Sequence, residues 1–270
     1  MAQGGSMVSV RTYFAAGALF LLACGCSGNA SPGMTASAQV VEEKWTKGDI
    51  IYQNPLSPET DMAGWRMEGP GQTAFQNGWM QMWSPDEAGH HVFWMPETLP
   101  DSFIAEWDAQ ALKTDAGLVI VFFAAKGIHG EDIFDASLAP RDGTFTQYTN
   151  GDIRSYHISY YANAAHNPAR GHANLRKNNT FSLLQQGEPG IAATDTRINH
   201  IRLVKHKNHI QLSINGRTVI DYTDDMPVVD GIDTGPPLQD GKLGFRQMQW
   251  TKFQYRDLKI WALKGAGHGE

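Results

Sequence analysis

The feature that most constrains this chain is a period-two alternation of apolar and polar residues over short runs that are separated by turn residues. Period two places successive side chains on opposite faces of an extended strand. The clearest run is 209–222, where Asn215-Gly216 is the favoured two-residue turn of a β-hairpin and Leu212 and Ile214 share one face. No long amphipathic helix is apparent in the pattern. The sequence therefore predicts an all-β sandwich or barrel.

One run departs from alternation in an informative way. Residues 117–125 are apolar on both faces, which predicts a central strand that is covered on both sides. With 270 residues and 41% hydrophobic content, the chain can bury one substantial core. We expect one domain at residues 48–263, followed by a disordered tail at 264–270.

The N-terminal segment has the pattern of an export signal. An apolar run at 13–23 follows Arg11 and is too short to span a membrane. Both cysteines of the chain, Cys24 and Cys26, come directly after it. This order predicts a lipoprotein-type signal peptide at 1–26, lipidation at Cys24 or Cys26 and a linker at 27–47, with ordinary secretion as the alternative. Either way we expect an exported protein, anchored through lipid in the periplasm or at the outer membrane, with no other membrane contact.

The charge of the chain limits its partners. The formal net charge is −6, whereas a nucleic-acid-binding protein is usually basic. Any anionic ligand must therefore be held by a local cluster of Arg or Lys side chains, because the overall field does not attract it. The oligomeric state is not indicated by the sequence.

The stretch 152–178 carries the most suggestive polar pattern. In its first half, apolar positions alternate with His157 and Tyr161, and in its second half Arg176 points away from the apolar face. By the same alternation, Arg246 lies opposite the core-facing residues of its own strand. A general acid or base beside two cations is what a site for an acidic sugar needs.

Several motifs taken together resemble one family. They are YQNPL at 52–56, WRMEG at 65–69, VFWMPE at 92–97, FFAA at 122–125 with GED at 130–132, HISY at 157–160, NLRK at 174–177 and GFRQM at 244–248. The chain resembles the YesU-like family over about residues 48–262. This family consists of bacterial concanavalin-type jelly rolls, found among polysaccharide-degradation genes and long classed as a domain of unknown function.

The resemblance implies an all-β, concanavalin-like jelly-roll β-sandwich of two antiparallel sheets that acts on uronic-acid oligosaccharides of the ulvan or pectin type. The implied reaction is β-elimination, as a dehydratase or lyase, without an organic cofactor. Arg176 and Arg246 would neutralise the substrate carboxylate, and His157 or Tyr161 would move the proton. The further substrate contacts expected in the groove are Asn174, Glu131 and Trp94.

Other interpretations of the same residues stay open. The protein could be a non-catalytic carbohydrate-binding jelly roll, with its tryptophans in the core and its arginines in structural ion pairs. It could also be a glycoside hydrolase, although the paired-Glu motif of the retaining jelly-roll enzymes is incomplete after Glu106. Glu131 and Asp132 could bind a structural calcium ion. The histidine spacing fits no zinc motif, so we expect no catalytic metal.

Overall fold

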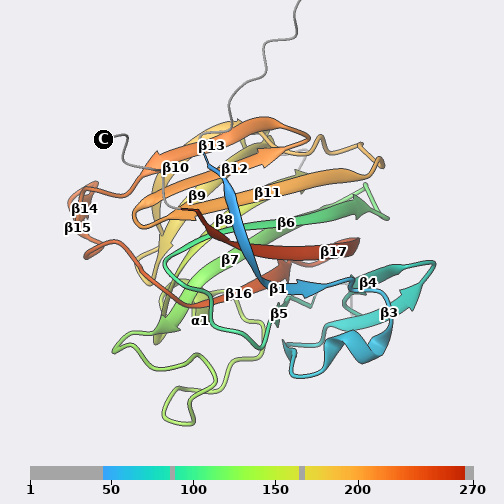
Figure 1. Cartoon of the computed structure of the whole chain (residues 1–270), viewed down its shortest axis with the longest axis horizontal. Helices are drawn as coiled ribbons and strands as arrows, with labels where there is room; N and C mark the ends of the chain where they lie inside the picture. The colour runs from blue at the N-terminus through green and yellow to red at the C-terminus, as the bar shows by residue number, and fades with distance from the viewer. Residues whose placement is uncertain (1–44, 86–88, 164–167, 265–270) are drawn as a thin grey trace, which may run out of the picture. The chain divides into compact units, whose positions relative to one another are not determined.

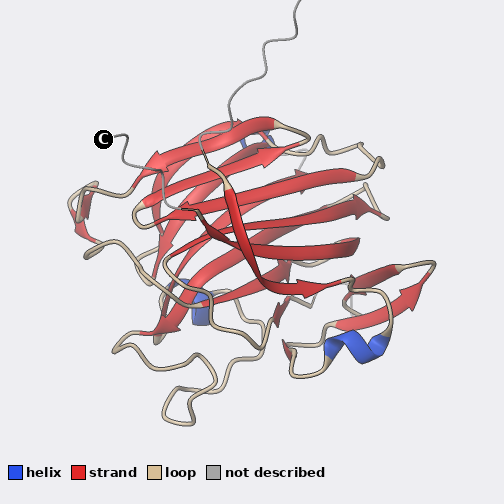
Figure 2. Cartoon of the chain, in the orientation of Figure 1, coloured by secondary structure: helices blue, strands red, loops and turns tan. Residues whose placement is uncertain are grey.

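The computed structural model describes residues 45–85, 89–163 and 168–264, whose regular secondary structure is almost entirely β-strand (Figures 1 and 2). The helices among them are α1 (Thr146–Thr149) and two 3-10 turns, η1 (Glu59–Met62) and η2 (Pro168–Gly171). No helix in these ranges is long and apolar enough to cross a membrane. The expected signal peptide with Cys24 and Cys26, most of the linker and residues 265–270 of the tail lie outside the described residues.

One antiparallel sheet has eight strands. Seven follow one another in the spatial order β13 (Arg217–Thr223), β12 (His209–Ile214), β11 (Asn199–His206), β6 (Ser102–Ala111), β17 (Lys252–Leu263), β4 (Trp79–Trp83) and β3 (Gln72–Gln76), and β1 (Lys47–Asn54) pairs with β17. The strand β6 thus lies between two strands from the second half of the chain.

The other antiparallel sheet has seven strands. Their spatial order is β10 (Ser182–Pro189), β9 (His172–Asn178), β8 (Ile153–Asn163), β7 (Gly117–Gly127), β16 (Lys242–Gln247), β5 (His91–Trp94) and β2 (Arg66–Glu68). A small hairpin of β14 (Val228–Val229) and β15 (Ile232–Asp233) projects at one side (Figure 1). The two large sheets confirm the predicted all-β jelly-roll sandwich.

The main hydrophobic core fills the space between the sheets. Trp107 on β6 meets the ring of Phe245 on β16 edge to face, with 5.4 Å between the ring centroids. Val121 on β7 and Leu212 on β12 belong to the same fully buried cluster. On β6, β12 and β16, the alternation in the sequence therefore assigns these core-facing residues correctly.

A second apolar cluster covers the face of the seven-stranded sheet that is turned away from the other sheet, which we call the outer face. Leu118 and Ile120 of β7 lie on it, together with Tyr148 of α1. The segment between β7 and β8 folds back across part of this face and buries these residues. The strand at 117–125 is therefore covered on both sides, as its composition predicts.

The hairpin predicted at Asn215-Gly216 is also present. Ile214 pairs with Arg217, so the two residues between them form the whole loop. Their φ angles of 51° and 78° lie in the left-handed region that a type I′ turn requires, and which Asn and Gly tolerate best.

Candidate functional site

A pocket of about 240 Å³ opens on the outer face of the seven-stranded sheet, above β7, β8 and β9. Its polar lining consists of His157, Ser159, Arg170, Asn174 and Arg176. Apolar side chains of Leu118, Ile120, Phe145, Phe181 and Met248 complete the walls. Among the described residues, no Asp or Glu side chain lines this pocket. Its fixed charges are therefore cationic, and we call it the arginine pocket.

The register of two neighbouring strands brings the polar side chains together. His157 of β8 pairs with Arg176 of β9, and Ser159 pairs with Asn174. Directly opposed residues of an antiparallel pair point to the same face of the sheet. The four side chains therefore form a compact block, and His157, Asn174 and Arg176 share the surface that their alternation predicts.

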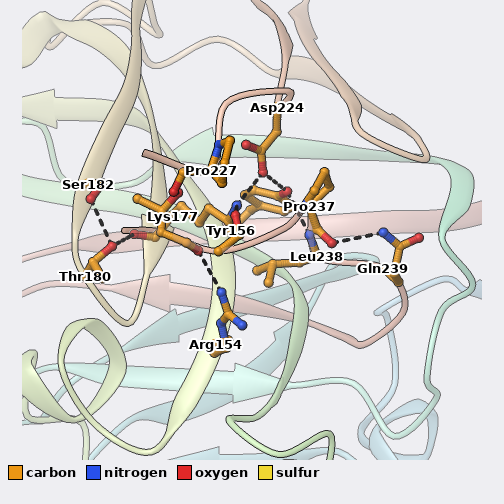
Figure 3. A network of polar contacts seen from close by, with 12 residues as sticks. Arg154, Tyr156, Lys177, Thr180, Ser182, Asp224, Pro227, Pro237, Leu238 and Gln239 are labelled. Carbon is orange, nitrogen blue, oxygen red and sulfur yellow. Dashed lines mark hydrogen bonds and ion pairs between the residues drawn. The ribbon is translucent and has the colours of Figure 1, made fainter. Parts of the chain in front are cut away.

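The opposite face of β9 is held by a buried polar network (Figure 3). Lys177 lies 2.8 Å from the carboxylate of Asp224, and its Nζ also donates a hydrogen bond of 2.8 Å to the carbonyl of Gly235. Tyr156 donates its hydroxyl hydrogen to the same carboxylate. Because Lys177 is anchored on that face, the preceding residue Arg176 is directed into the arginine pocket.

His157 lies at the base of the pocket and is only 3% exposed. The amide nitrogen of Asn178 donates a hydrogen bond of 2.9 Å to its Nδ1, which leaves the ring hydrogen on Nε2. Burial, with a smaller effect from the positive charges of Arg176 and Arg246, lowers the pKa of His157 to about 3. The imidazole is therefore neutral at physiological pH.

Arg176 is held over an aromatic ring. Its guanidinium carbon lies 4.1 Å from the centroid of the Phe181 ring, and NH1 donates a hydrogen bond of 2.9 Å to the Phe181 carbonyl. Within the described part of the chain, no carboxylate forms an ion pair with it. A stacked guanidinium keeps its remaining N–H groups in a fixed plane, which suits a planar carboxylate.

Comparison with known sequences places this chain in a family. The profile of a family described as "Domain of unknown function (DUF1961)" matches residues 49–260. The chain belongs to the DUF1961 family. It is also 39% identical over 219 residues to the uncharacterized protein YesU of Bacillus subtilis, covering 80% of this chain and 97% of that protein. The resemblance to the YesU-like family is thus confirmed.

Solved structures agree with this assignment. A Bacillus subtilis protein of unknown function with a galectin-like fold is 38% identical, with a TM-score of 0.75 over 81% of this chain and 98% of that one. The exoplasmic/lumenal domain of VIP36 in its Ca²⁺/Man-bound form is 9% identical, with a TM-score of 0.51 over 82% of this chain and 94% of that one. The second likeness shows the fold alone.

In this DUF1961 chain, Arg246 lies on the expected face but does not reach the pocket. It is fully buried beneath the segment between β7 and β8, where NH2 donates a hydrogen bond of 2.9 Å to the carbonyl of Gly143. Its guanidinium carbon lies 4.8 Å from the ring of Tyr148 and 5.2 Å from that of Phe145. Burial lowers the pKa of Arg246 to about 10. Arg246 therefore acts on the pocket through its charge, and the expectation of direct substrate contact is corrected.

Tyr161 lies on the other side of the sheet, contrary to the expectation that it shares a face with His157. Val119 pairs with Tyr161, whereas Ile120 pairs with Ser159, so one extra residue of β8 forms a bulge. After the bulge the side chains change faces. Tyr161 packs on the ring of Phe253 in the core and donates its hydroxyl hydrogen to the carbonyl of Ala193.

Trp94 and Glu131 are also separate from the arginine pocket. Trp94 is fully buried, and its Nε1 donates a hydrogen bond of 2.9 Å to Glu68, so its ring offers no surface for stacking a sugar. Glu131 lies in the loop after β7, where Oε2 accepts a hydrogen bond from the backbone of His129. Neither residue lines the arginine pocket, because the 128–149 segment covers Trp94 and carries Glu131, and its fold cannot be read from strand alternation.

Some residues of the site have no counterpart in the sequence-based prediction. Ser159 follows His157 with the same parity, so alternation could have found it. Arg170 and Phe181 come from the connections before and after β9, and the sequence gives no signal for their positions. Glu68 accepts hydrogen bonds from Trp94, Arg141 and Tyr148 and so ties the segment that carries Phe145 to the sheet.

No group of three or more potential metal ligands occurs among residues 45–85, 89–163 and 168–264. The two acids considered for calcium have other partners. Asp132 pairs with Lys242 at 3.0 Å, and Glu131 accepts the backbone hydrogen bond described above.

Proposed function

We propose that the protein binds oligosaccharides that contain uronic acid, of the ulvan or pectin type, and that the arginine pocket receives the uronate carboxylate. The observation that carries this proposal is the pocket lining, which includes Arg170 and Arg176 but no described Asp or Glu. An anion is the ligand that such a lining favours. The export pattern at residues 1–26 supports an activity outside the cytoplasm.

Each polar group has a role in this binding. Arg176, held on the Phe181 ring, pairs with the carboxylate, and the exposed Arg170 adds charge at the rim. Ser159 and Asn174 lie beside them and can exchange hydrogen bonds with ring hydroxyl groups. The walls of Phe145 and Phe181 contact the apolar face of a pyranose ring.

We propose further that the bound uronate undergoes β-elimination, which makes the protein a carbon-oxygen lyase. Neutralising the carboxylate acidifies the hydrogen at C5. The imidazole of His157 accepts that proton at Nε2, the electron pair forms the C4–C5 double bond, and the C4–O bond breaks. The imidazole then returns the proton to the departing oxygen, so that water or a sugar hydroxyl leaves and the enzyme is unchanged.

The position of the ring hydrogen must change for this step. Accepting a proton at Nε2 requires the hydrogen on Nδ1, and Oδ1 of Asn178 can receive that hydrogen if the amide turns over. Oδ1 is buried and has no hydrogen-bond partner within the described residues, so it is available for this contact. A substrate carboxylate beside Arg176 would also offset the arginine charge and raise the pKa of His157.

Binding without turnover is the second candidate, and the state of His157 favours it. An imidazole with a pKa of about 3 and its hydrogen on Nε2 is a weak base and a good hydrogen-bond donor. In that case the pocket would act as a carbohydrate-binding site. A glycoside hydrolase finds less support, because its acid and nucleophile would have to come from outside the described pocket lining.

The test incubates the purified protein with saturated uronate oligosaccharides while the ultraviolet absorbance of the conjugated C4–C5 double bond is followed. Mass spectrometry then shows whether water is lost or the chain is broken. Calorimetry measures the dissociation constant in parallel. We expect Arg176→Ala to weaken binding by about tenfold or more, because a charge-assisted contact is lost.

The variant His157→Gln separates the two candidates. We expect it to lose the unsaturated product while it retains binding. Arg197→Ala serves as control, because Arg197 is exposed, pairs with Asp195 and lies outside the pocket. Binding without any absorbance change would establish the carbohydrate-binding candidate, and unaltered binding by Arg176→Ala would overturn the site assignment.

A further inference from the structure

A second pocket of about 200 Å³ lies at the opposite edge of the seven-stranded sheet, between β2 and the segment 133–141. Arg66, Phe134 and Arg141 contribute to its lining. Arg141 is already engaged, because it pairs with Glu68 and donates to the carbonyl of Ile133. Arg66 is exposed, and within the described ranges it forms no ion pair with a carboxylate.

Arg66 is presented in the same way as Arg176. Its guanidinium carbon lies 4.3 Å from the centroid of the Phe134 ring, compared with 4.1 Å between Arg176 and Phe181. In both cases an aromatic ring supports one face of the guanidinium, and the N–H edge stays available for a ligand. Each of the two pockets therefore contains an arginine that is oriented before any ligand arrives.

The two arginines also lie in one line across the sheet. Strand register pairs residues in the continuous row Arg66, Trp94, Gly244, Phe122, His157 and Arg176. Residues paired in this way point to the same face, so both arginines are on the outer face. Five strand intervals of about 4.8 Å separate them, which gives about 24 Å along the sheet.

We propose that Arg66 forms a second anion-binding subsite for the same oligosaccharide, which binds an acidic group several sugar units away from the uronate held by Arg176. The inference rests on the proposed function, since it assumes that the arginine pocket binds an acidic sugar. It adds that the ligand is a polyanionic chain that extends from one pocket to the other over the segment that covers Trp94 and Phe122. A single acidic sugar would occupy the arginine pocket alone.

The acids of the second pocket are compatible with this role. Glu68 is neutralised by Arg141 at 2.8 Å and accepts further hydrogen bonds from Trp94 and Tyr148. The carboxylate of Asp135 turns back to accept hydrogen bonds from the backbone and hydroxyl of Ser137. Arg66 is therefore the cation of this pocket that an incoming anion can pair with.

Arg66 is exposed on the edge strand β2, which makes the proposal testable by substitution. Lys242 lies 5.3 Å from the Phe134 ring and pairs with Asp132, so the loop keeps these contacts when Arg66 is changed. The variant is Arg66→Gln, which removes the charge and keeps most of the length. The matched control is Arg197→Gln, which removes one exposed positive charge outside both pockets.

The experiment measures dissociation constants by calorimetry for a uronate disaccharide and for a long uronate oligosaccharide. We expect the wild-type protein to bind the long ligand more tightly than the disaccharide. Arg66→Gln should lose about tenfold in affinity for the long ligand and nothing for the disaccharide, because one charge-assisted contact disappears. Arg197→Gln should behave like the wild-type protein with both ligands.

The outcomes separate this inference from the proposed function. If the wild-type protein binds the disaccharide but Arg66→Gln binds the long ligand as tightly as wild type, the second subsite is wrong and the arginine pocket stands. A loss of disaccharide binding in Arg66→Gln would mean that Arg66 shapes the arginine pocket, which also overturns the subsite. If the wild-type protein binds neither ligand, the proposed function fails and the subsite fails with it.

Discussion

The side-chain amide of Asn178 donates its hydrogen bond to Nδ1 of His157 over 2.9 Å, and this contact decides how the imidazole faces the arginine pocket. The same amide nitrogen donates to Ser155, so the orientation of Asn178 is set by two acceptors at once. His157 consequently presents Nε2–H to a ligand. Asn178, the hydrogen-bond partner of Nδ1, therefore determines the tautomer of His157, and the pocket does not.

We predict that Asn178→Asp raises the pKa of His157 from about 3 to about 4–6, because a carboxylate beside Nδ1 stabilises the charged ring. NMR titration of the imidazole nitrogens measures this pKa directly. The control is Asn199→Asp, which places the same new carboxylate at another buried asparagine, on the eight-stranded sheet. An unchanged pKa in Asn178→Asp would show that the amide contact does not govern the ring.

The buried neutral histidine also predicts how stability depends on pH. The pKa of His157 is about 3 when folded, below the ordinary value of 6.5, so between these values the unfolded chain binds more protons. The free energy of unfolding must therefore fall as the pH falls through this window. Its share of the slope is about 1.4 kcal/mol per pH unit. His91, whose pKa burial also lowers to about 3, acts in the same direction.

Comparison with a variant isolates this effect from other titrating groups. A hydrogen bond to Glu106 raises the pKa of His200, so His200 makes the free energy of unfolding rise as the pH falls, opposite to His157. Carboxylates contribute mainly at lower pH. Denaturant unfolding between about pH 6.5 and about pH 5 should give a shallower slope for His157→Gln than for wild type. Replacing the exposed His129 by Gln should leave the slope unchanged. Equal slopes for all three proteins would contradict a neutral buried His157.

The position of Tyr161 in the core leads to a third prediction. Tyr161→Phe removes one hydrogen bond to Ala193 and should lower the free energy of unfolding by about 1 kcal/mol, without changing ligand affinity. Ser159→Ala should weaken ligand binding and change the free energy of unfolding little, because Ser159 lines the pocket. Chemical denaturation and calorimetry measure the two quantities. Weakened ligand binding by Tyr161→Phe would show that Tyr161 contributes to the binding site after all, contrary to its position in the core.

The contrast between these two residues shows what the sequence can predict. Alternation assigns His157, Asn174 and Arg176 to one face, since a regular strand repeats every two residues. It misplaces Tyr161, because a single bulged residue in β8 reverses the faces beyond it and leaves no mark in the composition. Local pattern is therefore reliable only up to the first irregularity of a strand.

The segment between β7 and β8 limits the prediction for a different reason. Arg246 lies on the face that alternation assigns to it, but this segment covers Arg246 and Trp94 alike. Its position depends on Glu68, which meets Arg141 across 73 residues of sequence. A contact over such a separation has no local signal, so the sequence cannot show which outward-facing residues stay exposed.

The last prediction concerns the network that positions Arg176. Lys177 and Asp224 are 0% and 1% exposed, and they form an ion pair at 2.8 Å (Figure 3). Lys177→Met removes the ammonium charge and leaves the carboxylate of Asp224 buried beside Tyr156 without a cation. We expect it to lower the free energy of unfolding by about 3–5 kcal/mol, because an uncompensated buried charge is costly. Chemical denaturation measures this loss.

The double variant shows whether the loss comes from the unpaired charge. Lys177→Met combined with Asp224→Asn removes both charges and keeps an acceptor for the Tyr156 hydroxyl, so it should be more stable than Lys177→Met alone. The control pair is Lys126→Met with Asp240→Asn, at a partly exposed ion pair of 2.7 Å where screening by water limits the coupling. If the double variant at Lys177 and Asp224 is no more stable than Lys177→Met, the loss arises from packing instead. Arg176 would then owe its direction to the shape of β9 and not to the buried ion pair behind it.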